Sequence, residues 1–125
     1  MTTPTQLDEQ DFEFFVSRLI KPGQDIIDSM SPRKANILHM AVGIAGEAGE
    51  LLDAIKKGVM YNKPFDEENI LEELGDLEFY MEGLRQAFGI TRSEVIEHNV
   101  AKLNARYKDG YSDKAAQIRA DKTST

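Results

Sequence analysis

Four stretches of this chain carry apolar residues at intervals of three and four, and none alternates with the period of two that is typical of β-strands. They span residues 5–20, 32–57, 66–88 and 91–107, and we predict a helix for each. Residues 112–125 contain few apolar side chains, so we predict that they form a polar tail. The expected fold is an all-α, single-domain antiparallel bundle of about four helices.

Local signals indicate where these helices begin and end. Serine, threonine and aspartate accept hydrogen bonds from the free N–H groups of a first helical turn, and glycine often follows the last turn. Proline is also favoured in the first turn, because the N–H group that it lacks has no partner there. The predicted starts are Ser31–Pro32, Asp66 and the capping-box pattern Thr91–Glu94, and the predicted ends are Gly58 and Gly89.

Two acidic pairs stand out on consecutive predicted helices. Glu47 and Glu50 are three residues apart, as are Glu73 and Asp76. Side chains at this spacing are neighbours on a helix surface, and each pair borders the apolar stripe of its helix on the edge of the same rotational sense. The short connection between the helices favours an antiparallel hairpin. In that arrangement both pairs lie on one side, and all four carboxylates converge.

Converging carboxylates repel one another unless their pKa values rise or a cation binds. Mg²⁺ fits such a site, because it prefers oxygen ligands, keeps several waters and bridges to substrate phosphates. A solvated acidic face is the commoner explanation for one such pair, whereas two pairs on matching edges favour a site. Nearby glycines allow either close helix packing or room for a ligand beside the acids, and these glycines are Gly43, Gly46 and Gly49.

Composition narrows the choice of partner. The formal net charge of −7 argues against a general affinity for nucleic acid or for an anionic membrane. The chain contains no cysteine, so a metal site must use oxygen or nitrogen ligands. It has neither the basic and apolar regions of a signal peptide nor about 18 consecutive apolar residues, so a cytoplasmic location is the default expectation. At 125 residues, oligomerisation would help to bury the apolar faces.

The fourth predicted helix carries Asn99, Lys102 and Arg106 at positions i, i+3 and i+7, which share a face. Two cations and an amide suit the outer oxygens of a polyphosphate. Taken alone, such residues are more often ordinary surface groups.

Three ordered motifs resemble those of the MazG-like family of all-α nucleoside triphosphate pyrophosphohydrolases. They are Gly46-Glu-Ala-Gly-Glu-Leu51, Glu72-Glu-Leu-Gly-Asp-Leu77 and Asn99-Val-Ala-Lys-Leu-Asn-Ala-Arg-Tyr-Lys-Asp-Gly-Tyr111. The likeness spans residues 32–112 and is closest to the short, single-domain members found in bacteria and phages. Some relatives have an acid directly before the first motif. This chain has Gly46 there, so no role is transferred to that position.

The resemblance implies Mg²⁺-dependent hydrolysis of (deoxy)nucleoside triphosphates to the monophosphate and pyrophosphate, with Mn²⁺ as a substitute ion, in a homodimer or homotetramer. It implies catalytic metal ligands at Glu47, Glu50, Glu73 and Asp76, and substrate-binding residues at Asn99, Lys102 and Arg106. Two alternatives stay open. One is hydrolysis of a related pyrophosphate such as phosphoribosyl-ATP. The other is a non-catalytic helical interaction module whose apolar stripes bind a partner protein.

Overall fold

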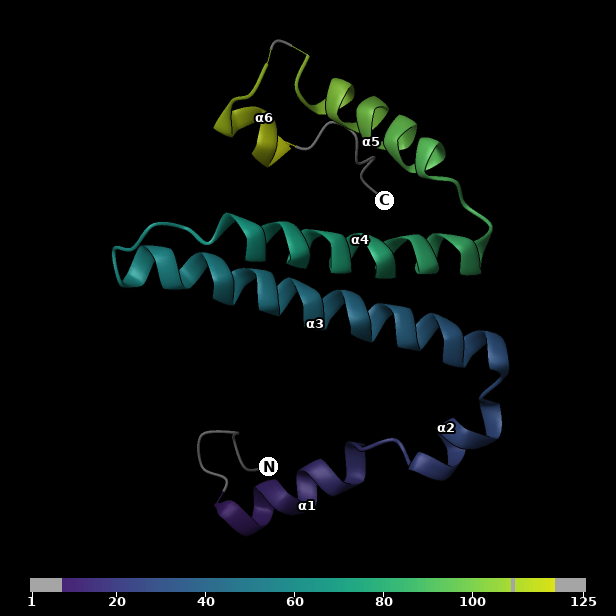
Figure 1. Cartoon of the computed structure of the whole chain (residues 1–125). Coiled ribbons are helices and arrows are strands. Elements are labelled where there is room, and N and C mark those ends of the chain that lie inside the picture. The colour runs from purple at the N-terminus through teal and green to yellow at the C-terminus, as the bar shows by residue number, and fades with distance from the viewer. Residues whose placement is uncertain (1–7, 109, 119–125) are drawn as a thin grey trace. The chain divides into compact units, whose positions relative to one another are not determined.

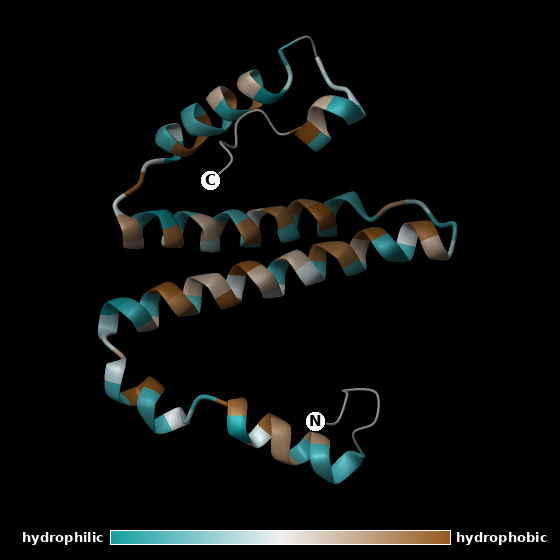
Figure 2. Cartoon of the chain, turned by 180° about the vertical axis from the view of Figure 1, so that it is seen from behind, coloured by the Kyte–Doolittle hydropathy of each residue, from teal (hydrophilic) through white to brown (hydrophobic). Residues whose placement is uncertain are grey.

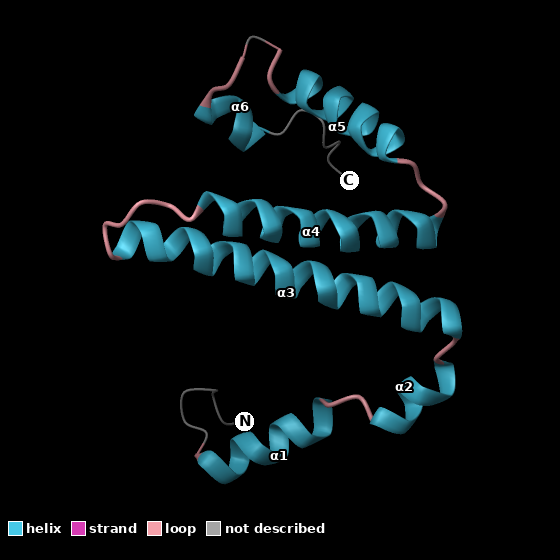
Figure 3. Cartoon of the chain, viewed as in Figure 1, coloured by secondary structure: helices cyan, strands magenta, loops and turns pink. Residues whose placement is uncertain are grey.

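The computed structural model describes residues 8–108 and 110–118, and within them the regular structure consists of six helices and no β-strand (Figure 1 and Figure 3). The predicted all-α fold is therefore confirmed. Residues 5–7 of the first predicted helix and residues 119–125 of the predicted tail lie outside the described residues. The helices are α1 (Glu9–Leu19), α2 (Gly23–Ser29), α3 (Pro32–Met60), α4 (Glu67–Phe88), α5 (Arg92–Arg106) and α6 (Asp113–Ile118).

The capping residues bind the helix ends as the sequence indicated. A side-chain oxygen just before each of α3, α4 and α5 accepts a hydrogen bond from a backbone N–H group in the first turn. These bonds, each 3.1 Å long, join Ser31 to Lys34, Asp66 to Asn69 and Thr91 to Glu94. At the end of α4, Gly89 adopts a left-handed φ of 65°, a conformation that glycine reaches without steric cost.

The structure differs from the sequence prediction in three places. Helix α2 lies between the first two predicted helices, where no helix was predicted, and it begins directly after Pro22, a residue that is tolerated at the start of a helix. Helix α6 lies inside the predicted tail, where the hydroxyl of Ser112 accepts a 3.0 Å hydrogen bond from the Ala115 N–H group. Helix α3 continues past Gly58 to Met60. Gly58 is buried inside the helix, against the ring of Phe65, and does not end it.

The chain forms two compact units, one ending at Ala35 and the other beginning at Asn36 within α3. The first unit contains α1 and α2. On α1, the guanidinium carbon of Arg18 lies 5.7 Å from the centre of the Phe14 ring, a cation–π contact. The second unit contains most of α3 together with α4, α5 and α6. Both acidic pairs belong to this second unit.

In the second unit, α3 and α4 form the predicted antiparallel hairpin (Figure 1). Met40 on α3 packs against Gly83 on α4, and further along α3 Gly43 packs against Tyr80, which comes earlier on α4. This reversed order of contacting positions is the mark of antiparallel helices. The hairpin therefore brings the middle of α3 beside the middle of α4.

Apolar side chains recur along all the helices, as the brown segments of Figure 2 show, yet few of them are buried. Among the described residues, Ala54 is the only buried hydrophobic side chain, and no large side chain is fully buried. No helix in this part of the chain is both long and apolar enough to cross a membrane.

Candidate functional site

Three carboxylates from the two helices of the hairpin meet in one small volume. One oxygen from each of Glu47 on α3 and Glu73 and Asp76 on α4 lies within 4.8 Å of the others. We call these three residues the acidic cluster. Glu47 and Glu73 are half-buried, whereas Asp76 is exposed. The structure thus brings together three of the four carboxylates that the spacing of the two motifs predicted to converge.

Glu50, the fourth predicted carboxylate, is exposed and is not part of this close group. Its negative charge nevertheless contributes to raising the pKa of Glu73, so it lies near the cluster. Glu50 is one turn beyond Glu47 on the same helix, and a side chain of this length can change its rotamer. It therefore stands at the edge of the cluster.

Within the acidic cluster, the environment raises the pKa of Glu73. Burial raises the pKa of the Glu73 carboxyl above its ordinary range, because the charged form loses contact with water. The neighbouring Glu47 raises this pKa further, since protonated Glu73 can donate a hydrogen bond to the Glu47 carboxylate. The charges of Glu47, Glu50 and Asp76 act in the same direction. Without a cation, Glu73 therefore holds its proton more tightly than an isolated glutamate does.

The Oε2 atom of Glu73 tests whether the acidic cluster fits a cation. Oε2 is buried, and no hydrogen-bond donor within the described residues reaches it. A buried acceptor without a donor costs free energy, so such atoms are uncommon in folded proteins. A hard divalent cation would satisfy this oxygen and would offset the repulsion among the three carboxylates. The residues of the acidic cluster therefore fit an ion such as Mg²⁺.

The glycines near the cluster divide into two kinds. A Cβ atom at Gly43 would overlap the ring of Tyr80, so this glycine serves close helix packing. A Cβ atom at Gly46 or Gly49 would meet no atom within 4 Å, so these glycines leave open space beside the acids. Close helix packing thus applies to Gly43, whereas room for a ligand beside Gly46 and Gly49 stays a prediction. Sequence reasoning missed the pairing of Gly43 with Tyr80, although Tyr80 borders the apolar stripe one turn after Asp76.

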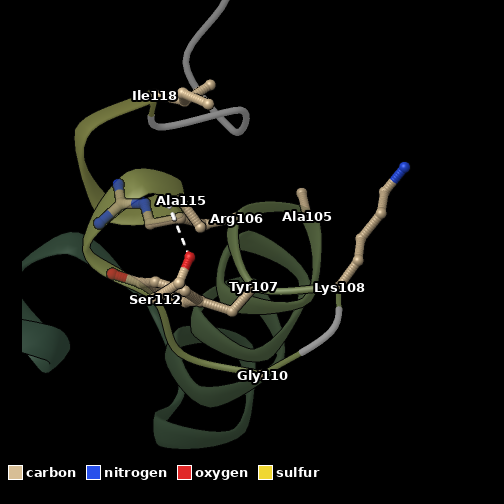
Figure 4. A pocket seen from close by; sticks show the side chains of 8 residues that line it. All are labelled: Ala105, Arg106, Tyr107, Lys108, Gly110, Ser112, Ala115 and Ile118. Carbon is tan, nitrogen blue, oxygen red and sulfur yellow. Dashed lines mark hydrogen bonds between the residues drawn. The ribbon is translucent and has the colours of Figure 1, made fainter.

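The three predicted phosphate-binding residues lie on α5. Asn99 is exposed and Lys102 is half-buried. Arg106 lines a pocket of about 280 Å³ between the end of α5, the following segment and α6 (Figure 4). The guanidinium carbon of Arg106 is 6.0 Å from the centre of the Tyr107 ring, which also lines this pocket. A cationic side chain thus stands at a cavity large enough for a small ligand group.

Comparisons with known proteins identify the family of this chain. Residues 36–111 match the family described as the MazG nucleotide pyrophosphohydrolase domain, and the match begins where the second compact unit begins. The chain is also similar to the Gene 37 protein of Mycobacterium phage L5, with 29% identity over 97 residues, and the match covers 73% of this chain and 80% of the phage protein. No solved structure matches the chain. Because the family match covers more than half of the sequence and includes the whole acidic cluster, the chain belongs to the MazG nucleotide pyrophosphohydrolase domain family.

Proposed function

We propose that this protein hydrolyses nucleoside or deoxynucleoside triphosphates to the monophosphate and pyrophosphate in a reaction that depends on Mg²⁺. The observation that carries this proposal is the meeting of three carboxylate oxygens within 4.8 Å at the centre of a MazG family domain. The buried Oε2 of Glu73, which no donor within the described residues reaches, supports a cation as the partner of this oxygen. Mn²⁺ also prefers oxygen ligands and is expected to substitute for Mg²⁺.

The four acidic residues would bind the metal ion, and one of them would also act as the general base. Bound Mg²⁺ would neutralise charge on the phosphate oxygens and make a water molecule more acidic. Glu47, Glu73 and Asp76 hold the ion, and Glu50 completes the site after a change of side-chain rotamer. One of these four carboxylates accepts the proton of the attacking water.

The α5 side chains act on the substrate phosphates. Lys102 and Arg106 supply positive charge where the departing pyrophosphate accumulates negative charge, and Asn99 donates a hydrogen bond to a phosphate oxygen. The planar guanidinium of Arg106 can bind two phosphate oxygens in a bidentate geometry, whereas a lysine ammonium acts as a point charge. The pocket beside α6 that Arg106 lines includes no residue of α3 or α4, so the phosphate-binding role of Arg106 rests on the resemblance to the family.

The test is incubation of the purified protein with each canonical NTP and dNTP, with Mg²⁺ or with EDTA, followed by chromatographic separation of the products. We expect monophosphate and pyrophosphate in the Mg²⁺ samples alone. Diphosphate and phosphate would show that a different bond is cleaved. Turnover of phosphoribosyl-ATP in place of the triphosphates would favour the related-substrate alternative. If Mg²⁺ and Mn²⁺ both give no turnover of any of these compounds, the interaction-module alternative would replace the catalytic one.

We further propose that the active form is a dimer or tetramer of this chain. A chain of this length must bury most of its apolar side chains to be stable, yet Leu52 on α3 and Leu71 on α4 are 65% and 71% exposed. A second copy would cover such residues, as in other homo-oligomers. Sedimentation velocity should therefore give the mass of two or four chains at micromolar concentration. A monomer at this concentration would contradict the proposal.

A further inference from the structure

The α3–α4 hairpin is held close by two reciprocal contacts. The Tyr80 ring of α4 lies against Gly43 of α3, and the Met40 side chain of α3 lies against Gly83 of α4. In both cases an added Cβ atom on the glycine would overlap the opposing side chain. We call these four residues the glycine clasp. Each helix thus offers a notch to a large side chain of the other, which lets the two backbones approach closely.

The glycine clasp lies next to the acidic cluster. Gly43 is one helical turn before Glu47 on α3, and Tyr80 is one turn after Asp76 on α4. Residues four apart lie on the same face of a helix, one above the other. A change in the helix separation at Gly43 and Tyr80 therefore passes directly to the separation of Glu47 and Asp76.

The Tyr80 ring also contacts two aromatic rings beside it. The ring of His39 lies edge-to-face with it at a centroid distance of 6.1 Å, and the Phe79 ring does so at 5.2 Å. Met40 differs, because an unbranched thioether adapts easily to a changed surface. The contact between Tyr80 and Gly43 is thus the stiffer half of the glycine clasp. A methyl group at position 43 would be relieved mainly by movement of the helices.

We propose that Gly43 is a positioning residue whose notch for the Tyr80 ring sets the helix separation that allows Glu47 and Asp76 to bind the same metal ion. This inference rests on the metal-binding role assigned under the proposed function. Gly43 has no side chain that could bind the ion, so it acts on ion binding only through the separation of the two helices. The carboxylates repel one another, so the packing beside them must hold them together before the ion arrives.

The test is calorimetric titration of the metal-free protein with Mn²⁺, comparing the wild type with Gly43→Ala and Gly46→Ala. The two variants carry the same chemical change on the same helix, but only the new methyl group at position 43 meets an atom within 4 Å. We expect Gly43→Ala to weaken Mn²⁺ binding at least tenfold with the helical circular dichroism retained. We expect Gly46→Ala to bind Mn²⁺ within about twofold of the wild type, because its methyl group enters open space.

A second variant tests whether the effect of Gly43→Ala arises from the overlap with the Tyr80 ring. In the Gly43→Ala, Tyr80→Ala double variant, the ring that the new methyl group would meet is gone. Relief of the overlap should restore part of the lost Mn²⁺ affinity relative to Gly43→Ala alone. If Gly43→Ala acted through anything other than this overlap, the removal of Tyr80 would weaken binding further, because a second packing contact is lost.

The outcomes distinguish this inference from the proposed function. Mn²⁺ binding that is equal in the wild type and in Gly43→Ala would overturn the positioning role and leave the metal site intact. A wild type that does not bind Mn²⁺ would overturn both. A double variant that binds more weakly than Gly43→Ala would also overturn the positioning role.

Discussion

Replacement of Asp76 by asparagine is expected to lower kcat for nucleoside triphosphate hydrolysis by more than about 100-fold, because loss of a residue that merely orients a metal ligand already costs about 10- to 100-fold. Asp76 contributes one of the three oxygens that lie within 4.8 Å of each other. Asparagine has nearly the same shape but a neutral amide, so the site loses charge without losing volume. Steady-state assays at saturating substrate and Mg²⁺ measure the effect.

The same variant should keep its fold. Asparagine at position 76 removes one negative charge that now contributes to the raised pKa of Glu73, so the thermal stability of the metal-free protein should be equal or higher. Glu78→Gln is the matched control. It also removes one negative charge from α4, but Glu78 is exposed and faces Arg85 at 3.6 Å rather than the acidic cluster. Near-native activity of Asp76→Asn would contradict the metal assignment.

Mg²⁺ is expected to stabilise the protein at pH 7, by about 2.7 kcal/mol at an ion concentration of about 100 times Kd. The ion binds carboxylates that are brought together only in the folded state, so binding favours folding. Thermal unfolding with Mg²⁺ and with EDTA measures this gain. Asp76→Asn should show little of it. An unchanged melting temperature of the wild type at millimolar Mg²⁺ would argue for a solvated acidic face.

The stability that Mg²⁺ adds should increase as pH rises through the raised pKa of Glu73. The pKa of Glu73 is raised in the folded protein, so this state holds its proton more tightly than the unfolded state does. In EDTA, the contribution of Glu73 to stability is present below about pH 4.3, the ordinary pKa of glutamate, and is lost as pH rises through the raised pKa. Mg²⁺ should compensate over this interval. Glu73→Gln has no titrating group at this position and should lose this part of the pH dependence.

The parts of the structure that the sequence predicted are those determined by local chemistry. Ser31, Asp66 and Thr91 each cap the helix that follows, because one side-chain oxygen and one backbone N–H group are sufficient for this interaction. The meeting of Glu47 with Asp76 also follows from local rules, namely helical periodicity and a short connection. In the described part of the chain, these caps and this pair of carboxylates lie where the sequence predicted them.

What the sequence did not predict depends on contacts between distant residues. No local rule distinguishes Gly43, which receives the Tyr80 ring, from Gly46, which faces open space, because the difference arises from the register of α3 against α4. The same register leaves Glu50 at the edge of the acidic cluster. Helix α6 could have been recognised, since Ser112 followed by Asp113 is a common helix start. Its polar composition instead favoured the prediction of a tail.

The measurement that tests the metal assignment most directly is anomalous diffraction from a crystal of the protein soaked in Mn²⁺. The proposed function requires the ion at the acidic cluster. We therefore predict an anomalous peak in contact with carboxylate oxygens of Glu47, Glu73 and Asp76, at about 2.0–2.3 Å from each, as for hard divalent ions bound by oxygen. A well-diffracting crystal that bound Mn²⁺ elsewhere, with no peak at these three carboxylates, would contradict this account of the site.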